Sequence, residues 1–348
     1  MNTVLVTGNL GYIGVVLSEV LLERGYDVVG LDTGYYSGCG LSSFREVNRQ
    51  ITKDIRDVTP ADLVGIDAIV HLAALSNDPL GELRPGLTEE INLFGTINLA
   101  KHARSLGIPR FVYASSQSMY GVAATEAELE EDGSEKNPLT VYARTKWDAE
   151  LALKKLGSDA FDVVCLRPST VFGASPMLRC DIVFNNLVAC AYTTGRIEIK
   201  SDGTPWRPVV HVRDVASAFI AGLEAPSELV AGESFNVGIP DGNFTVRDLA
   251  EAAQRVVPGS TLTFTGEHGN DSRTYRISFG KILSVLAGYY RPNWTLDTGG
   301  AELVALFDRV GFTEAQFRGF PVNRLQQVRR LLDASQLNSE LRWTDAKE

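Results

Sequence analysis

Residues 7–14 read TGNLGYIG and stand between a short apolar run at residues 3–6 and a longer segment with helical periodicity. The apolar run predicts a buried strand, and the periodic segment predicts a helix that ends near Gly25. Glycines at a turn from strand to helix permit a tight turn and let the backbone approach a pyrophosphate at the helix N-terminus. This stretch therefore predicts a dinucleotide-binding strand–helix–strand unit.

An aspartate at the end of the next apolar run indicates which dinucleotide binds. Asp32 lies 18 residues after Gly14. A carboxylate there accepts hydrogen bonds from the adenosine ribose hydroxyls and repels a 2'-phosphate. Asp32 therefore favours NAD over NADP, although a strand-end aspartate also serves elsewhere as a simple cap.

Short apolar runs alternate with helical segments along the first half of the chain, at residues 4–6, 28–31, 68–72, 111–114 and 163–166. Such alternation is typical of parallel strands joined by crossover helices. We predict an α/β fold with a doubly wound, Rossmann-type parallel sheet and a smaller C-terminal substrate-binding domain. The predicted ranges are 1–172 for the NAD-binding domain, a returning strand–helix segment near 207–240, and 173–348 mainly for the substrate-binding domain and a helical tail that serves packing or a partner.

Composition excludes several classes of function. The 348 residues include 43 acidic and 33 basic ones, a formal charge of -10 that disfavours nucleic acid as a partner. We find no stretch of about 20 uninterrupted apolar residues, as a membrane helix requires, so a soluble protein without a membrane partner is expected. The four cysteines lack metal or disulfide spacing, which favours reduced thiols in the cytoplasm. His71, His102 and His211 have no partners at ligand spacing, so no metal site is predicted.

The three glycines, with one extra residue between the first two, resemble the turn of extended short-chain dehydrogenases/reductases, in the NAD-dependent epimerase/dehydratase family. Further matches follow in order along about residues 1–285: DIRD at 54–57, HLAA at 71–74, Asn92 with Gly95 and Thr96, and FNVG at 235–238. The resemblance is greatest to the sugar-nucleotide epimerases. It implies cofactor contacts from Gly8, Leu10, Gly11, Tyr12, Ile13, Gly14, Asp32, Asp54, Ile55, Leu72, Ala73, Ala74, Asn92, Tyr142 and Lys146.

Tyr142 and Lys146 stand four residues apart, which places a phenol and an ammonium on one face of a helix. A nearby cation, together with the positive nicotinamide ring, favours the phenolate and lowers the tyrosine pKa. We therefore expect Tyr142 to be the general base and acid. The resemblance adds that Lys146 holds the nicotinamide ribose. An ordinary pair on an exposed helix would have the same spacing.

Ser116 follows the apolar run at 111–114 and so belongs at the carboxyl end of the sheet, where ligands bind. The resemblance makes it the third catalytic residue, which bonds the reacting oxygen. We expect Ser118 to support it, and the strand-end hydroxyl of Ser115 to bond backbone. In the family's 4,6-dehydratases a glutamate usually stands two residues after the catalytic serine or threonine. Gln117 and Ser118 occupy these places here, and neither is a carboxylate, so dehydration is disfavoured.

Several residues are expected to contact the substrate. The segment at 203–214 resembles the one whose arginine binds the diphosphate, and Arg207 occupies that position. The family often has a second phosphate-binding arginine further along the chain, but the sequence here departs from that pattern. Arg273 or Arg276 is left as the residue that could replace it. The full set of predicted contacts is Ser76, Ser116, Gln117, Ser118, Asn185, Arg207 and Arg273. For Asp78, we expect a helix-capping role rather than a sugar contact.

These expectations favour NAD-dependent epimerisation of a nucleotide-diphosphate sugar through a transient keto sugar, with C4 as the reacting carbon. A keto-sugar reductase or dehydrogenase would use the same Ser116, Tyr142 and Lys146. A 4,6-dehydratase and a non-catalytic dinucleotide-sensing protein are less favoured alternatives. We expect a homodimer.

Overall fold

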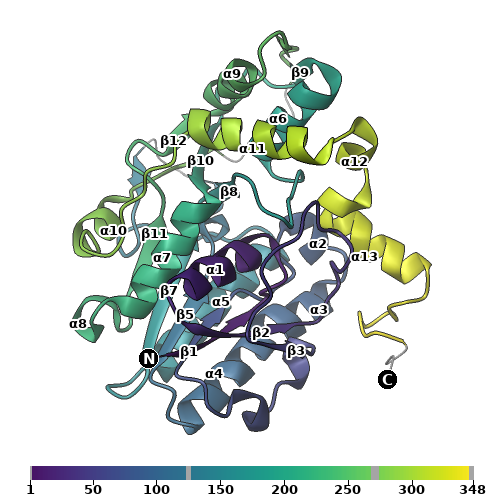
Figure 1. Ribbon diagram of the computed structural model, residues 1–348. Helices are drawn as coiled ribbons and strands as arrows, with labels where there is room; N and C mark the ends of the chain where they lie inside the picture. The colour runs from purple at the N-terminus through teal and green to yellow at the C-terminus, as the bar shows by residue number, and fades with distance from the viewer. Residues whose placement is uncertain (1, 123–126, 268–273, 345–348) are drawn as a thin grey trace.

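The computed structural model describes residues 2–122, 127–267 and 274–344 (Figure 1). A seven-stranded sheet forms its centre, in the order β11-β7-β5-β4-β1-β2-β3, and every neighbouring pair is parallel. The strands are β1 (Thr3–Thr7), β2 (Asp27–Asp32), β3 (Arg49–Thr52), β4 (Ala68–His71), β5 (Arg110–Ala114), β7 (Asp162–Pro168) and β11 (Ser234–Val237). The order reverses at β1, so the predicted doubly wound α/β fold is confirmed.

Helices cover both faces of this sheet because its strands are apolar on both sides. Val4 and Val6 of β1 belong to one buried cluster, whereas Leu5 between them belongs to another. α1 (Tyr12–Glu23) and α7 (Val212–Glu224) pack together on the first face, and α4 (Gly95–Ser105) and α5 (Val141–Leu156) pack together on the second. The sheet is thus a rigid central layer between two apolar cores.

A second group of elements lies above the main sheet in Figure 1. Helices α6 (Val183–Thr194), α9 (Val246–Val256) and α11 (Leu296–Val310) pack on one another, with α12 (Glu314–Arg318) against α6. They accompany small sheets formed by β8 (Thr170–Phe172), β10 (Trp206–His211) and β12 (Asn243–Thr245), and by β9 (Arg196–Ile199) and β13 (Thr261–Phe264). Gly195 ends α6 in the left-handed conformation, with φ of 69°, which glycine adopts without strain.

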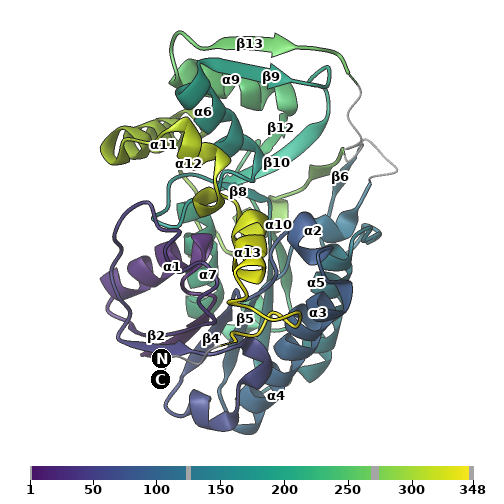
Figure 2. The same cartoon turned by 90° about the vertical axis from the view of Figure 1, so that its right-hand side faces the viewer.

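The chain passes between the two groups more than once. After β8 and α6 it returns through α7 and β11, which pairs with β7 at the edge of the main sheet. It leaves again and comes back at its end as η5 (Phe320–Val322) and α13 (Arg324–Asp333) (Figure 2). The remaining elements are η1 (Ile55–Asp57), η2 (Pro60–Leu63), α2 (Asp78–Gly81), α3 (Pro85–Glu89), η3 (Glu90–Phe94), η4 (Gln117–Tyr120), β6 (Glu128–Leu129), α8 (Ser227–Val230), β14 (Arg276–Ile277) and α10 (Gly280–Val285).

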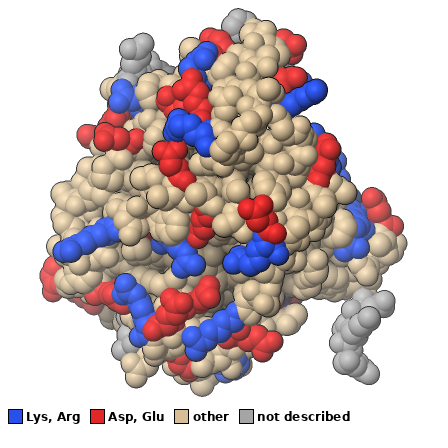
Figure 3. Space-filling view, turned by 45° about the horizontal axis from the view of Figure 1, so that its top comes forward, with Lys and Arg blue, Asp and Glu red and all other residues tan. Residues whose placement is uncertain are grey.

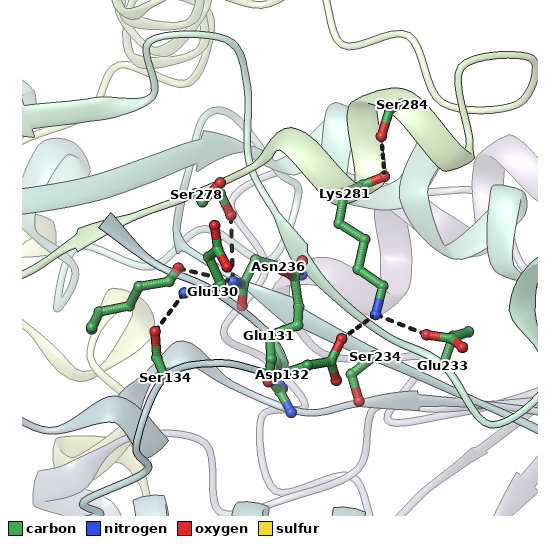
Figure 4. Close-up of polar contacts among 12 residues, drawn as sticks. Glu130, Glu131, Asp132, Ser134, Glu233, Ser234, Asn236, Ser278, Lys281 and Ser284 are labelled. Atoms are coloured by element: carbon green, nitrogen blue, oxygen red, sulfur yellow. Dashed lines mark hydrogen bonds and ion pairs between the residues drawn. The ribbon is translucent and has the colours of Figure 1, made fainter. Parts of the chain in front are cut away.

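Polar contacts fasten the segment after β6 to the edge strand β11 (Figure 4). Lys281 of α10 forms ion pairs of 2.8 Å with both Asp132 and Glu233. The backbone amide of Asn236 donates to Glu131 Oε1 at 2.7 Å. These contacts position the chain that leads from the carboxyl end of β5 toward α5.

On the face shown in Figure 3, acidic and basic side chains are interspersed, which distributes the net charge. No helix among the described residues is both long and apolar enough to cross a membrane.

Candidate active site

The glycine turn forms one wall of a pocket at the carboxyl end of β1. Gly8 has a φ of 73°, and the amide of Gly11 donates to its carbonyl at 3.0 Å. A Cβ atom on Gly14 would lie 2.1 Å from the Gly8 oxygen, and one on Gly8 would lie 2.8 Å from the Ala73 nitrogen. Side chains at these positions would collide with backbone, so the turn requires glycine and leaves its helix N-terminus open to a ligand.

We call this first pocket the cofactor pocket. Its lining includes most of the predicted cofactor contacts, namely Gly8, Gly11, Tyr12, Ile13, Gly14, Asp32, Asp54, Ile55, Leu72, Ala73 and Ala74. Leu10 and Asn92 lie outside this lining. The Leu10 amide donates to Asp32 Oδ2 at 3.2 Å, and the Asn92 side chain accepts from the Leu75 amide at 2.8 Å. Leu10 and Asn92 therefore position residues of the pocket wall.

Asp32 is held at the end of β2 by backbone amides. Besides Leu10, the Gly34 amide donates to it, to Oδ1 at 2.8 Å. Burial raises the pKa of Asp32, and the two amide bonds act in the opposite direction. The glycine turn, the carboxylate and the apolar wall of Leu72 and Ala73 together fit a dinucleotide.

A second cavity, which we call the substrate pocket, adjoins the first and shares Tyr12, Ile13, Leu72, Ala74, Ser76 and Arg179 with it. Ser116, Ser118, Tyr142, Lys146 and Arg207 all line the substrate pocket. The structure thus brings the predicted catalytic residues and the predicted diphosphate-binding arginine to one cavity beside the cofactor pocket.

Helix α5 presents Tyr142 and Lys146. Thr140 caps the helix by accepting from the Ala143 amide at 3.1 Å, and Lys146 Nζ donates to the Ala114 carbonyl at 2.7 Å. Burial lowers the pKa of Lys146 to about 7. Burial also raises the pKa of Tyr142, while its hydrogen bond with Ser116 acts to lower that pKa. The expected lowering of the Tyr142 pKa depends in part on the nicotinamide ring of bound NAD, so it stays a prediction for the protein with its cofactor.

The turn after β5 positions the serines. Ser116 caps η4, accepting from the Ser118 amide at 3.2 Å, and the two hydroxyls lie 2.8 Å apart. Gln117 also lines the substrate pocket but is buried, and its Nε2 donates to the Arg167 carbonyl at 3.0 Å. The expectation that the Ser115 hydroxyl bonds backbone is wrong, because its Oγ donates to Glu150 Oε2 at 2.5 Å.

The other predicted substrate residues differ in their placement. Arg207 Nη1 donates to the Trp206 carbonyl at 2.8 Å. Asn185 is completely buried outside the pocket lining, where its Oδ1 accepts from the Gly173 amide at 2.9 Å. Arg273 lies outside the described residues. Arg276 forms an ion pair of 3.0 Å with Glu128.

Sequence reasoning missed or misplaced several pocket residues. Asn77, not Asp78, caps α2 by accepting from the Leu80 amide at 2.9 Å. Asp78 instead lines the substrate pocket and accepts from the Thr140 hydroxyl at 2.6 Å. Arg179 lines both pockets, and Arg324 lines the cofactor pocket. Neither arginine belongs to a recognisable motif, so only the fold reveals them.

Among the described residues there is no group of three or more histidine, cysteine or acidic side chains able to hold a metal ion.

The fold and the two pockets define a Rossmann-type, dinucleotide-binding protein with a serine–tyrosine–lysine site. Residues 4–238 match the NAD dependent epimerase/dehydratase family. The chain belongs to this family, which confirms the resemblance and makes NAD its cofactor. It is thus an enzyme of the NAD-dependent sugar-nucleotide epimerase/dehydratase class.

Similar proteins catalyse more than one reaction. A UDP-glucose 4-epimerase of Mycolicibacterium smegmatis is 32% identical over 324 residues, covering 87% of this chain and 97% of that protein. UDP-glucuronic acid decarboxylase 1 of Arabidopsis thaliana is 26% identical over 322 residues, covering 91% of this chain and 72% of that protein. The solved structure of MoeE5 with UDP-glucuronic acid and NAD has a TM-score of 0.75 and 25% identity, covering 88% of this chain and 99% of MoeE5.

Proposed function

We propose that this enzyme interconverts two UDP-sugars that differ in configuration at C4, through a transient 4-keto sugar. The observation that carries the proposal is the grouping of Ser116, Tyr142 and Lys146 in the substrate pocket, next to the cofactor pocket, with Gln117 and Ser118 where a dehydratase has an acid. The relatives that act on UDP-sugars support uridine diphosphate as the carrier group.

Each residue has a role in this reaction. Tyr142 takes the proton from the sugar hydroxyl and later returns it, while Ser116 hydrogen-bonds the same oxygen. Lys146 holds the nicotinamide ribose beside them. Hydride acceptance and return is the chemistry that NAD supplies when bound. Arg207 binds the diphosphate, for which a planar fork of donors is well suited. The keto sugar would turn within the pocket, so that its other face would meet the hydride that bound NAD supplies.

One observation favours a second candidate, a dehydratase. Asp78 places a carboxylate in the substrate pocket, close enough for its charge to raise the pKa of Tyr142. A carboxylate there is able to act as the base that a dehydration at C5 and C6 requires. A keto-sugar reductase, the other alternative, would consume added reduced cofactor.

Incubation with a panel of UDP-hexoses, UDP-N-acetylhexosamines and UDP-hexuronic acids tests these candidates. Chromatography of the mixture, with absorbance at 340 nm followed in parallel, separates the outcomes. The proposal predicts partial conversion of one sugar to its C4 epimer, from either direction, without accumulation of NADH. Stoichiometric oxidation of added NADH or NADPH, with a reduced sugar as product, would establish a reductase instead.

A homodimer and a cytoplasmic location belong to the same proposal. Phe94 at the end of η3 and Leu151 on α5 are 59% and 39% exposed, on elements that pack against each other, and exposed apolar side chains of this size suit a partner surface. The four cysteines are free thiols, as in a reducing compartment. Light scattering on the eluting protein should give twice the mass of 37.9 kDa. A mass equal to that of one chain would contradict the proposed homodimer. Cell fractionation tests the proposed cytoplasmic location.

A further inference from the structure

The C-terminal segment, residues 320–344, packs against the loops that follow β2 and β3 beside the cofactor pocket (Figure 2). Gln327 Nε2 donates to the Tyr35 carbonyl at 2.9 Å, and Trp343 Nε1 donates to the Thr33 carbonyl at 2.7 Å. Tyr35 and Thr33 both line the cofactor pocket. The C-terminal segment therefore supports the wall of the cofactor pocket at Thr33 and Tyr35.

The first residue of α13 reaches into this pocket. Arg324 lines it and is only 2% exposed. Its Nη2 donates to the Met177 carbonyl at 2.7 Å, whereas its Nη1 is buried without a hydrogen-bond partner among the described residues. The guanidinium carbon lies 4.3 Å from the centre of the Tyr36 ring. A buried guanidinium with an unsatisfied donor is costly, and this cost points to an acceptor that binds in the pocket.

A second arginine lies nearby but has a carboxylate partner. Arg179 contacts Asp181 through Nε at 2.8 Å and Nη2 at 3.1 Å. Its Nη1 donates to Ser76 Oγ at 3.2 Å, and both residues line the cofactor and substrate pockets. Within the part of the chain that the structure describes, Arg324 forms no such ion pair. Its charge is therefore the less compensated of the two.

The two arginines lie along the path of a dinucleotide. Arg324 lines the cofactor pocket together with Asp32, at the expected adenosine end, and Arg179 also lines the substrate pocket together with Tyr142, at the expected nicotinamide end. A dinucleotide that spans these ends carries its pyrophosphate between them. The glycine turn supplies backbone amides to one side of that pyrophosphate, and the arginines supply guanidinium groups.

We propose that Arg324, delivered by the C-terminal helix and assisted by Arg179, binds the pyrophosphate of NAD. The C-terminal segment is then part of the cofactor site. This inference rests on the NAD dependence of the family and is independent of which sugar reaction the enzyme catalyses.

The test compares three ligands by calorimetry on protein freed of bound nucleotide. NAD and ADP-ribose contain the pyrophosphate, whereas adenosine contains only the part near Asp32. Arg324→Met should weaken the binding of NAD and of ADP-ribose by about 10- to 100-fold, the usual effect of a lost charge-assisted contact. The affinity for adenosine should stay within about twofold of the wild-type value. Arg329→Met is the matched control, because Arg329 is exposed on the same helix, and it should change none of the three.

Several results would overturn the proposal. Equal weakening of adenosine and ADP-ribose would mean that Arg324 only maintains the shape of the pocket. An unchanged affinity of Arg324→Met for NAD would mean that Arg324 does not contact the pyrophosphate. A loss of affinity confined to NADP would mean that Arg324 binds a 2'-phosphate instead. If Arg324→Met fails to fold by circular dichroism, Arg324→Lys replaces it. That variant keeps the charge but loses the fork, so ADP-ribose should weaken several-fold with adenosine unchanged, and wild-type affinity for ADP-ribose would contradict the assignment.

Discussion

The cofactor pocket and the substrate pocket are built in different ways. The cofactor pocket takes most of its wall from a few short segments at the carboxyl ends of β1, β2 and β4. The substrate pocket collects residues from Tyr12 to Leu325, on both the main sheet and the elements above it. A rigid sheet between two apolar cores therefore carries most of the cofactor pocket, whereas the substrate pocket also depends on the elements above that sheet. Changes in the two pockets should have separable effects.

The largest effect is expected at Tyr142, which lines the substrate pocket beside the cofactor pocket. Tyr142→Phe removes only a hydroxyl, so the fold and NAD binding should remain, while the rate should fall about 10²- to 10⁴-fold. Steady-state assays with the UDP-sugar substrate measure this. Tyr289→Phe is the control, since Tyr289 is 40% exposed, and its rate should equal that of the wild type. A Tyr142→Phe enzyme with a tenth or more of wild-type activity would require another acid/base residue.

A change at Arg207 should affect the substrate pocket alone. Arg207→Ala removes a charge-assisted phosphate contact worth about 1.5 to 3 kcal/mol, so UDP-sugar binding should weaken roughly 10- to 150-fold with NAD affinity unchanged. Titration calorimetry with the UDP-sugar and with NAD measures the two affinities separately. Arg255→Ala, which breaks an exposed ion pair of 2.9 Å with Asp297, should leave both affinities intact. Equal turnover by the wild type of a free sugar and its UDP conjugate would remove the reason for this role.

The buried Lys146 should make the stability of the protein depend on pH. The pKa of Lys146 is about 7 in the folded chain and near 10.5 when the chain is unfolded. Between these values the unfolded state binds more protons, so this group makes the free energy of unfolding rise with pH, by at most about 1.4 kcal/mol per unit.

Lys146→Met lacks this contribution. Urea unfolding of nucleotide-free protein at pH 7, 8 and 9 should therefore show wild type gaining stability relative to the variant. Parallel curves for the two proteins would mean that Lys146 is not buried as described.

The smallest effect is expected at Asp32. Asp32→Ala should narrow the preference for NAD over NADP several-fold, because the carboxylate that opposes a 2'-phosphate is gone. Asp27→Ala, at the exposed start of the same strand, should keep the wild-type preference. The dissociation constants of the wild type and both variants for NAD and NADP measure this preference. Tighter or equal binding of NADP by the wild type would contradict the ribose assignment.

The sequence predicts the parts of the site that rest on local patterns, and it does not predict the parts that the fold assembles from distant segments. The glycine turn, Asp32 and the Tyr142–Lys146 pair are local patterns whose spacing fixes their geometry, so the fold class and the cofactor were predictable. Arg179 and Arg324 are 145 positions apart and line the same pocket only because the chain returns to the sheet at its end. Asn77 and Asp78 are adjacent residues of types that cap helices, so the sequence does not distinguish them, and only the backbone at α2 shows that Asn77 is the cap. The pKa of Tyr142 also depends on burial, which periodicity does not measure.

The most direct test of the central claim is the mass of the product formed from a UDP-sugar in D₂O. Epimerisation at C4 removes and returns the same hydrogen, so the account predicts a product of unchanged mass with no deuterium bound to carbon, and with deuterium retained when the substrate carries it at C4. A product lighter by one water that has acquired solvent deuterium on carbon would show a dehydratase, with Asp78 as the first residue to replace. Loss of carbon dioxide from a UDP-hexuronic acid would show a decarboxylase, and either result would contradict the proposed function.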